Sequence, residues 1–326
     1  MTELTLTQQF TMIALNAQRS LEMTNAKIVA LRCMAVAVIL EVYLDSGFTQ
    51  DKNKLVLKKD VLNHSHSIRY RETILQPLGH TIGDLSGWLK QASLLSKRKL
   101  IEFEHAISDS LKEMSLLEEI PHILGCDLYF HSAGVEIKGY RSHIQEYTMI
   151  TEHIRAEILE DGTVTDETIC MLWLLRESGC MHDFFSRNEL EQVSARMYRL
   201  HQDNPLGKAL YGIRIHRGIE LAIKQFLRMK KVAVKTPVGS GLNFLFPILE
   251  RSQSVFIDTE AMFSNSTKRL HDVRMRLESM DHAVKVLGDG TIPIIKIDNT
   301  VYEAIPYATY GRVPIHGVRL LPIHPS

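Results

Sequence analysis

The sequence predicts a mainly α fold: a helical bundle core surrounded by amphipathic helices with short β-hairpins, followed by a small C-terminal α+β extension. Apolar residues recur at spacings of three and four through most of the first 230 residues, which is the helical period. Polar capping residues precede these segments. After Lys231, the prolines, glycines and serines of KTPVGSGLNFLFPILE mark a boundary. We therefore expect two domains, residues 1–231 and 232–326.

The early helices are placed by their caps. Thr5 with Gln8 forms a capping box before FTMIAL. Thr24 or Asn25 caps the next helix, which is apolar on nearly every side and is closed by Gly47. LVLKK, residues 55–59, is typical of an edge strand or hairpin arm. These features predict a buried helix within a soluble core.

The middle of the chain continues the helical pattern. Thr81 and Asp84 predict a cap for the segment around Trp88. The run from Ser96 to Leu117 carries one apolar stripe, formed by Leu100, Phe103, Ile107, Leu111 and Met114. Residues 127–140 alternate around a central glycine, as in a hairpin, and a helix is expected at about 141–159.

The last elements follow the same rules. Thr163 with Asp166 predicts a cap for a buried helix that ends at Gly179, and another helix is expected at about 187–202. Asn204 and Pro205 are a favourable N-cap and first residue for a long helix that closes the first domain at about Lys231. In the extension we expect a helix at about 259–285, a hairpin that turns at Asp298-Asn299, and a final strand in GVRLLP.

Composition excludes several classes of function. The 326 residues carry 38 Lys plus Arg and 38 Asp plus Glu, so the whole molecule has no field that would attract a nucleic acid. The four cysteines form no CxxC pair and are expected to be reduced thiols. No secretory leader is evident, and the apolar run 28–44 carries Arg32 and Glu41, which disfavour a membrane span. We expect a cytoplasmic protein, either free or peripheral on a membrane.

Known catalytic motifs are also missing from the sequence. It contains no GxSxG or HExxH, and VGSG at 238–241 is not followed by GK[ST]. We therefore expect no catalytic residues, no metal and no cofactor. An enzyme would require the polar groups of the tail to converge in one pocket, namely Arg312, His316, Arg319 and His324.

The order of the motifs resembles the Golgi phosphoprotein 3 family over residues 3–231. The resemblance is carried by LTLTQQFTMIAL, AVAVILEVYLDSGF, the LVL arm, and GYRSHIQEYTMITEHIRAEILEDGTVTDETICMLWLLRESG. It implies a helical, non-enzymatic domain that works as a peripheral-membrane adaptor, since the Golgi members bind phosphatidylinositol 4-phosphate. Their head-group residues are largely unmatched: Thr24 stands where the family has Trp, Arg32 lies one place from an Arg, and Thr163 and Asp166 occupy two further Arg positions.

A basic stripe is the main candidate for anion or lipid binding. In RIHRGIELAIKQFLRMKK, on a helix that advances about 100° per residue, five of the cations fall within an arc of roughly 100°, namely Arg214, Arg217, Lys224, Arg228 and Lys231. Each such cation near an anionic surface contributes about 1 kcal/mol. Alternatively, the stripe is only the solvated side of a docked helix. The candidate lipid-binding or anion-binding residues are therefore Arg32, Arg214, Arg217, Lys224, Arg228 and Lys231.

Two partners follow from these observations. The first is an anionic membrane lipid head group, bound by the stripe. The second is a protein partner or a second copy of the chain, recognised through residues 232–326 without lipid binding. The basic start of the helix at Lys97, Arg98 and Lys99 opposes the helix dipole and also favours an anionic partner.

Overall fold

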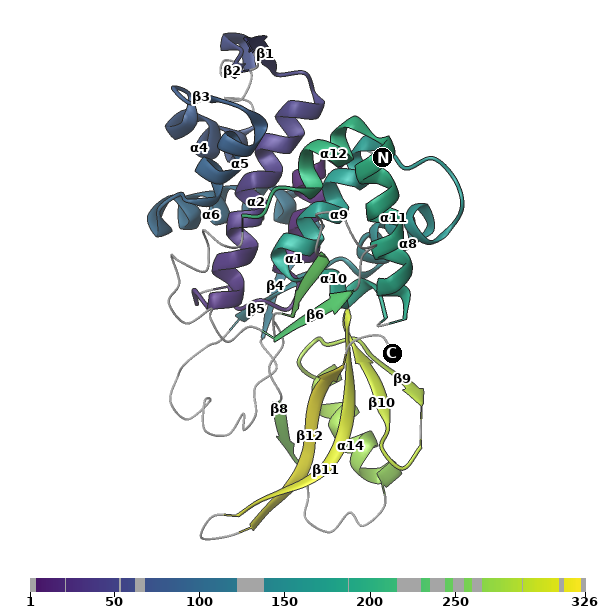
Figure 1. The fold of residues 1–326 in the computed structure, drawn as a ribbon. Helices are drawn as coiled ribbons and strands as arrows, with labels where there is room; N and C mark the ends of the chain where they lie inside the picture. Colours follow the sequence, from purple (N-terminus) through teal and green to yellow (C-terminus); the bar gives the residue numbers. More distant parts are fainter. Residues whose placement is uncertain are drawn as a thin grey trace.

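The computed structural model shows a mainly helical chain with small antiparallel sheets (Figure 1). The coarse fold class predicted from the sequence is therefore confirmed. Buried hydrophobic side chains form two clusters, one between Leu6 and Ile215 and another between Ile257 and Leu320. The structure describes residues 4–20, 22–52, 54–61, 68–121, 138–186, 188–215, 230–234, 244–248, 255–259, 266–288, 290–310 and 314–323.

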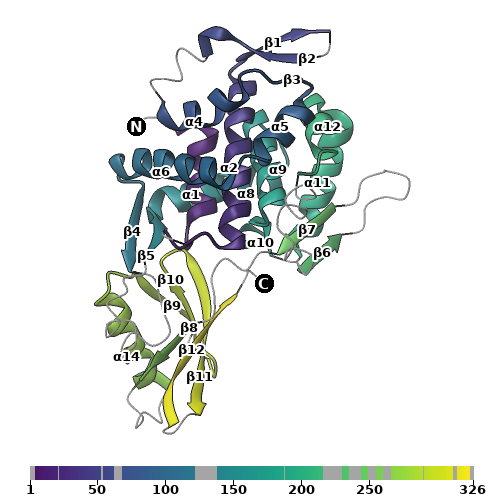
Figure 2. The ribbon, with the colours of Figure 1, turned by 90° about the vertical axis from the view of Figure 1, so that its left-hand side faces the viewer.

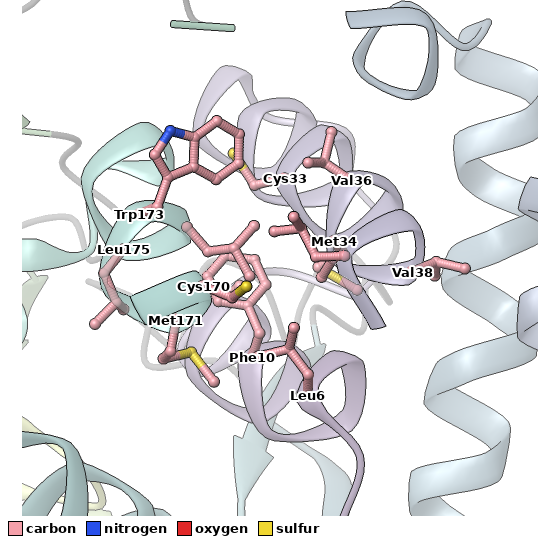
Figure 3. Packing of buried hydrophobic residues seen from close by; sticks show 14 of the residues in the cluster. Leu6, Phe10, Cys33, Met34, Val36, Val38, Cys170, Met171, Trp173 and Leu175 are labelled. Atoms are coloured by element: carbon pink, nitrogen blue, oxygen red, sulfur yellow. The ribbon is translucent and has the colours of Figure 1, made fainter. Parts of the chain in front are cut away.

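Helix α2 (Asn25–Leu44) lies in the middle of the helical part and is buried along almost its whole length. Its neighbours are α1 (Leu6–Leu15), α4 (Arg69–Leu78), α5 (Leu85–Ser93), α6 (Lys97–Glu113) and α9 (Asp166–Ser178), as Figure 2 shows. In Figure 3, Trp173 and Cys170 of α9 face Cys33 and Met34 of α2 and Phe10 of α1. Both α2 and α9 are apolar over most of their surface, as expected of helices that other helices cover.

The local caps agree closely with the sequence. Thr5 and Gln8 form the predicted capping box at α1, and the Thr24 side chain accepts from the Lys27 backbone amide. The cap of α9 is Thr165, two residues beyond the predicted Thr163. The difference arises because Glu157 accepts hydrogen bonds from the backbone and hydroxyl of Thr165 and fixes the helix entry there.

Two small antiparallel sheets accompany the helices, one of three strands and one of two. β1 (Phe48–Asp51) pairs with β2 (Lys54–Leu57), which also pairs with β3 (Ile82–Gly83), so the LVL arm is confirmed as a hairpin arm. The Trp88 indole Nε1 donates to the Leu55 carbonyl at 3.0 Å and ties this sheet to α5. β5 (Lys138–Ser142) pairs with β4 (Leu117–Pro121), while most of the hairpin predicted over residues 127–140 falls on residues that the structure does not describe. Residues 122–137 lie outside the described part.

The helices after β5 are α8 (Ile144–Leu159), α9, α10 (Met181–Phe184), α11 (Glu189–Asp203) and α12 (Pro205–Tyr211). Asn204 caps α12 as predicted, with Pro205 at its first turn. The predicted long helix to Lys231 is wrong, because α12 ends at Tyr211 and Lys230–Val234 forms strand β6.

Buried side chains on α9 explain where α12 stops. The Arg176 guanidinium donates to the carbonyls of Tyr211 and Ile213 at 3.0 and 2.8 Å. Glu177 accepts from the Ile215 amide at 2.7 Å, and in a continuing helix that amide would bond to the Tyr211 carbonyl. The interaction with α9 therefore replaces the next helical turn.

Strand β6 pairs with β7 (Phe244–Ile248), and this hairpin lies beside α9, α10 and α11. It therefore crosses the expected boundary at residues 231/232 and lies with the helical part (Figure 1). The prolines, glycines and serines near residue 231 predict a domain boundary there, whereas the contacts of the hairpin place it with helices α9, α10 and α11.

The C-terminal part is an antiparallel sheet in the order β8 (Val255–Asp258), β12 (Pro314–Ile323), β11 (Thr300–Tyr310), β10 (Ile294–Ile297), β9 (Val284–Gly288). Helix α14 (Ser266–Glu278) packs on one face. The α+β type and the turn at Asp298-Asn299 agree with the sequence. The helix, predicted to reach residue 285, ends at Glu278 because the chain turns back into β9.

A polar junction joins the two parts. Arg141 of β5 forms an ion pair with Asp298 at 3.2 Å and donates to the Asp281 carbonyl. The Asn299 amide donates to Asn16 at 3.1 Å and to the Ser142 carbonyl at 3.0 Å. The β10–β11 turn is thus fixed against β5, as seen below the helices in Figure 2.

Candidate functional site

Arg32 does not reach the surface. Arg32 is only 8% exposed, and its guanidinium Nη1 donates a hydrogen bond to the carbonyl of Ser93 at the end of α5. Burial lowers the pKa of this guanidinium, although an arginine stays charged at neutral pH. The structure therefore places Arg32 inside the helical part, and its role in lipid or anion binding stays a prediction. Its cation stabilises the C-terminal end of the α5 dipole.

Neither of the two described members of the predicted basic stripe lies on a helix. Arg214 is half-buried in the non-helical segment after α12, and Lys231 lies in strand β6. Arg217, Lys224 and Arg228 lie outside the described residues. Arg214 lies outside a helix because α9 holds residues 211–215 in another conformation, and Lys231 belongs to the β6–β7 pair.

The positions aligned with the family's head-group residues also serve other roles. Thr24 caps α2. Asp166 lies with Glu167 in the first turn of α9, where carboxylates complement the helix dipole. Thr24, Arg32, Thr163 and Asp166 therefore do not form a basic pocket in the described part of the chain.

A different group of residues is exposed at the connection between α5 and α6. We call it the α5–α6 corner and define it by Lys90, Leu94, Lys97 and Arg98. Leu94, the C-cap residue of α5, is 53% exposed, although leucine side chains are usually buried. Lys90 precedes it by four residues, which places both on the same side of α5.

Ser96 starts the other half of the corner. Its hydroxyl accepts from the Lys99 amide at 3.4 Å and caps α6, so that Lys97 and Arg98 occupy the exposed first turn. The Arg98 side chain is 89% exposed. The positive end of the α6 dipole adds to these charges.

The corner keeps a net positive charge. Glu102 accepts from Lys99 at 2.6 Å and from Arg98 at 3.2 Å, and the hydrogen bond from Lys99 lowers the pKa of Glu102. Lys90 and Lys97 form no ion pair with any residue that the structure describes. An exposed leucine flanked by unneutralised cations is a surface that can contact an apolar layer covered by anions.

Other candidate chemistries find little support in the described residues. No three His, Cys, Asp or Glu side chains gather there as a metal site requires. Cys33, Cys170 and Cys180 are buried free thiols, and burial raises the pKa of Cys33 and Cys170, which makes them poor nucleophiles. Of the four tail residues, Arg319 lies over the Tyr307 ring at 5.5 Å. The side chains of Arg312, His316 and His324 lie outside the described part.

Sequence reasoning found half of the corner. The sequence predicts the basic helix start at Lys97 and Arg98 but does not indicate Lys90 and Leu94. The spacing of four between them was readable in the sequence, but an apolar residue at the end of a helix is normally assigned to the core.

Comparison with protein-family models and with curated proteins found no match to the chain. No helix in the described part is both long and apolar enough to cross a membrane.

Proposed function

We propose that the chain is a peripheral-membrane adaptor that contacts anionic lipid surfaces through the α5–α6 corner. The observation that supports this most is the exposed Leu94 between Lys90, Lys97 and Arg98. The leucine enters the head-group layer, while the cations remain at the level of the lipid phosphates. In this role the chain binds a surface and performs no chemistry.

The expected affinity is modest. Three cations near an anionic surface contribute about 3 kcal/mol, at about 1 kcal/mol each. Full burial of a leucine contributes about 1.5–3 kcal/mol, and roughly half of Leu94 remains to be buried, which adds about 1 kcal/mol. A total of about 4 kcal/mol corresponds to a dissociation constant of about 1 mM in accessible lipid. Binding therefore depends on a high density of anionic lipid.

Co-sedimentation with vesicles tests the proposal. We expect the chain to bind vesicles that contain phosphatidylserine, to ignore pure phosphatidylcholine, and to dissociate as salt shortens the Debye length from about 10 Å towards 3 Å. The triple variant Lys90→Glu, Lys97→Glu and Arg98→Glu should lose at least about 100-fold in affinity, from removal of about 3 kcal/mol.

A matched control carries the same charge change elsewhere: Arg199→Glu, Lys208→Glu and Lys268→Glu, all exposed positions. If the control loses as much binding as the corner variant, the attraction is a general charge effect and the proposal fails. A third variant reverses Arg217, Lys224 and Arg228. Loss of binding in that variant alone would move the contact away from the corner and contradict the proposal.

The resemblance to the Golgi phosphoprotein 3 family supports a membrane role, and with it a helical bundle core. It also implies selectivity for phosphatidylinositol 4-phosphate. We propose general anionic recognition instead, because the described residues at the matched positions are used in caps and in the core. Vesicles of equal total charge, with and without this lipid, distinguish the two: a strong preference for it would favour the family's pocket.

A second candidate function is a protein-interaction module built on the C-terminal sheet. One observation favours it: an apolar sheet face that α14 does not cover. This role does not require lipid binding.

A further inference from the structure

The C-terminal sheet has two different faces. One face packs on α14 and forms a buried cluster that includes Ile295, Tyr302 and Leu320. Alternate residues of the same strands point to the opposite face, which we call the open face. Its described aliphatic side chains are all half-buried: Ile294, Val301, Ile305, Leu321 and Ile323.

The strand register makes these residues neighbours. Val301 is paired with Ile323, and Glu303 lies between Ile294 and Leu321 on the adjacent strands. None of the five aliphatic residues belongs to either hydrophobic cluster or packs against one, as far as the chain is described. In Figure 2, α14 lies to the left of the sheet, and no described helix or strand lies on its other side.

A solvent-facing sheet surface normally carries mostly polar residues, so a face on which five aliphatic side chains surround a few charged ones indicates a partner. We propose that the open face binds the open face of a second copy of this chain, as two sheets packed face to face about a two-fold axis. The inference deepens the second candidate function and is independent of the α5–α6 corner.

The size of the face fits such a dimer. With about 3.3 Å per residue and about 4.8 Å between strands, the strand residues span on the order of 500 Å² of flat sheet. Side chains roughen this surface, so its accessible area approaches the roughly 800 Å² per partner of a standard interface.

The open face carries both signs of charge, so two copies of it can pair opposite charges when they pack face to face. Glu303 lies on β11, and the two cations occupy diagonal positions on the adjacent strands: Lys296 on β10 is paired with Val301, and Arg319 on β12 is paired with Ile305. Arg319 is held over the Tyr307 ring, and Tyr307 is 44% exposed. A two-fold axis that passes midway between Glu303 and one of these cations brings Glu303 of each copy opposite that cation of the other, whereas an unrelated partner would need its own matching pattern.

Sedimentation velocity of the full chain at increasing concentration tests the inference. We expect a monomer–dimer equilibrium whose dissociation constant rises at least tenfold in Leu321→Glu and in Ile305→Glu. Met149→Glu, at a 56% exposed position on α8, is the matched control and should leave the equilibrium unchanged. A monomeric wild-type chain at all concentrations, or a dimer that persists in both sheet variants, would overturn the proposal.

Charge reversal provides a second test that identifies the face-to-face arrangement. Glu303→Lys alone, and Lys296→Glu with Arg319→Glu, should each form weak homodimers because like charges then face each other. An equimolar mixture of the two variants should dimerise again, since every opposed pair is opposite in sign. No recovery in the mixture, with both variants folded by circular dichroism, contradicts the two-fold face-to-face dimer. Vesicle binding by the monomeric Leu321→Glu variant reports separately on the corner.

Discussion

Replacing Arg176 with methionine should release the segment that follows α12. The arginine side chain is buried, and it donates to the carbonyls of Tyr211 and Ile213 at 3.0 and 2.8 Å. It also pairs at 2.9 Å with Glu177, whose own side chain is fully buried and accepts from the Ile215 amide. Methionine keeps the bulk of the side chain but removes the cation and its donors.

The loss in the free energy of unfolding follows from the buried groups that Arg176→Met leaves without a partner. Breaking a buried ion pair by removing one partner costs about 3–5 kcal/mol, because the other charge stays buried. The Tyr211 carbonyl loses its donor, whereas the Ile213 carbonyl still accepts from the Trp173 indole at 3.1 Å. We therefore expect Arg176→Met to cost about 4 kcal/mol, a large share of a typical stability of 5–15 kcal/mol. Adding Glu177→Gln removes the stranded charge and should restore part of that loss.

Urea unfolding followed by tryptophan fluorescence measures this loss. The chain has two tryptophans, so a Trp88→Phe background leaves Trp173, which lies next to the affected segment. Arg199→Met, at an exposed position, is the control and should change stability by less than about 0.5 kcal/mol. The reasoning is refuted if Arg176→Met costs no more than the control, or if the double variant is less stable than the single one.

Three further predictions follow from described contacts. The hydrogen bond from Arg155 lowers the pKa of Glu189 from 4.5 to about 2, so the stabilisation from this pair is complete above pH 4.5 and is lost as pH falls towards 2. Glu189→Gln should remove this slope in acid unfolding, by about 1 kcal/mol for a half-buried pair that water still screens. Gly207→Ala should lower the thermal midpoint at a cost of about 1–3 kcal/mol, because a Cβ there would lie 2.5 Å from the Leu200 carbonyl oxygen, and an unchanged midpoint would contradict the close approach. Arg141→Met should accelerate hydrogen exchange in the β10–β11 turn while leaving α2 protected; equal exchange in both proteins would show that the junction does not hold the sheet.

Local rules predicted the elements that local interactions determine. Thr5 with Gln8, Thr24, and Asn204 before Pro205 start helices where the sequence places them, because each cap involves residues within one helical turn. The hairpin at Asp298 is equally local, since that residue adopts the left-handed conformation that such turns favour. The general fold class followed from these repeated signals.

Long-range interactions account for most of the errors. The helix predicted through Ile215 stops early because Glu177, 38 residues away, takes that backbone amide. The guanidinium of Arg32, a candidate lipid-binding residue, donates to the carbonyl of Ser93, 61 residues away. The periodicity of a sequence cannot reveal such partners, since a buried charge and an exposed charge follow the same helical spacing.

The candidate site was accessible to sequence reasoning only in part. The basic start of α6 was visible as three consecutive cations, whereas the exposure of Leu94 depends on how α5 packs against α2. Apolar patterning indicates which residues can be buried, and the packed structure shows which of them remain outside.

The most direct test of membrane contact is an environment-sensitive fluorophore attached at Leu94→Cys. In a Cys126→Ser background the label should react selectively, because the remaining thiols of Cys33, Cys170 and Cys180 are buried. With phosphatidylserine vesicles, we predict a blue-shifted and brighter emission for the label at position 94, and no change for a label at Met149→Cys on the exposed side of α8. An unchanged emission at position 94 while the protein sediments with the vesicles would contradict membrane contact through the α5–α6 corner.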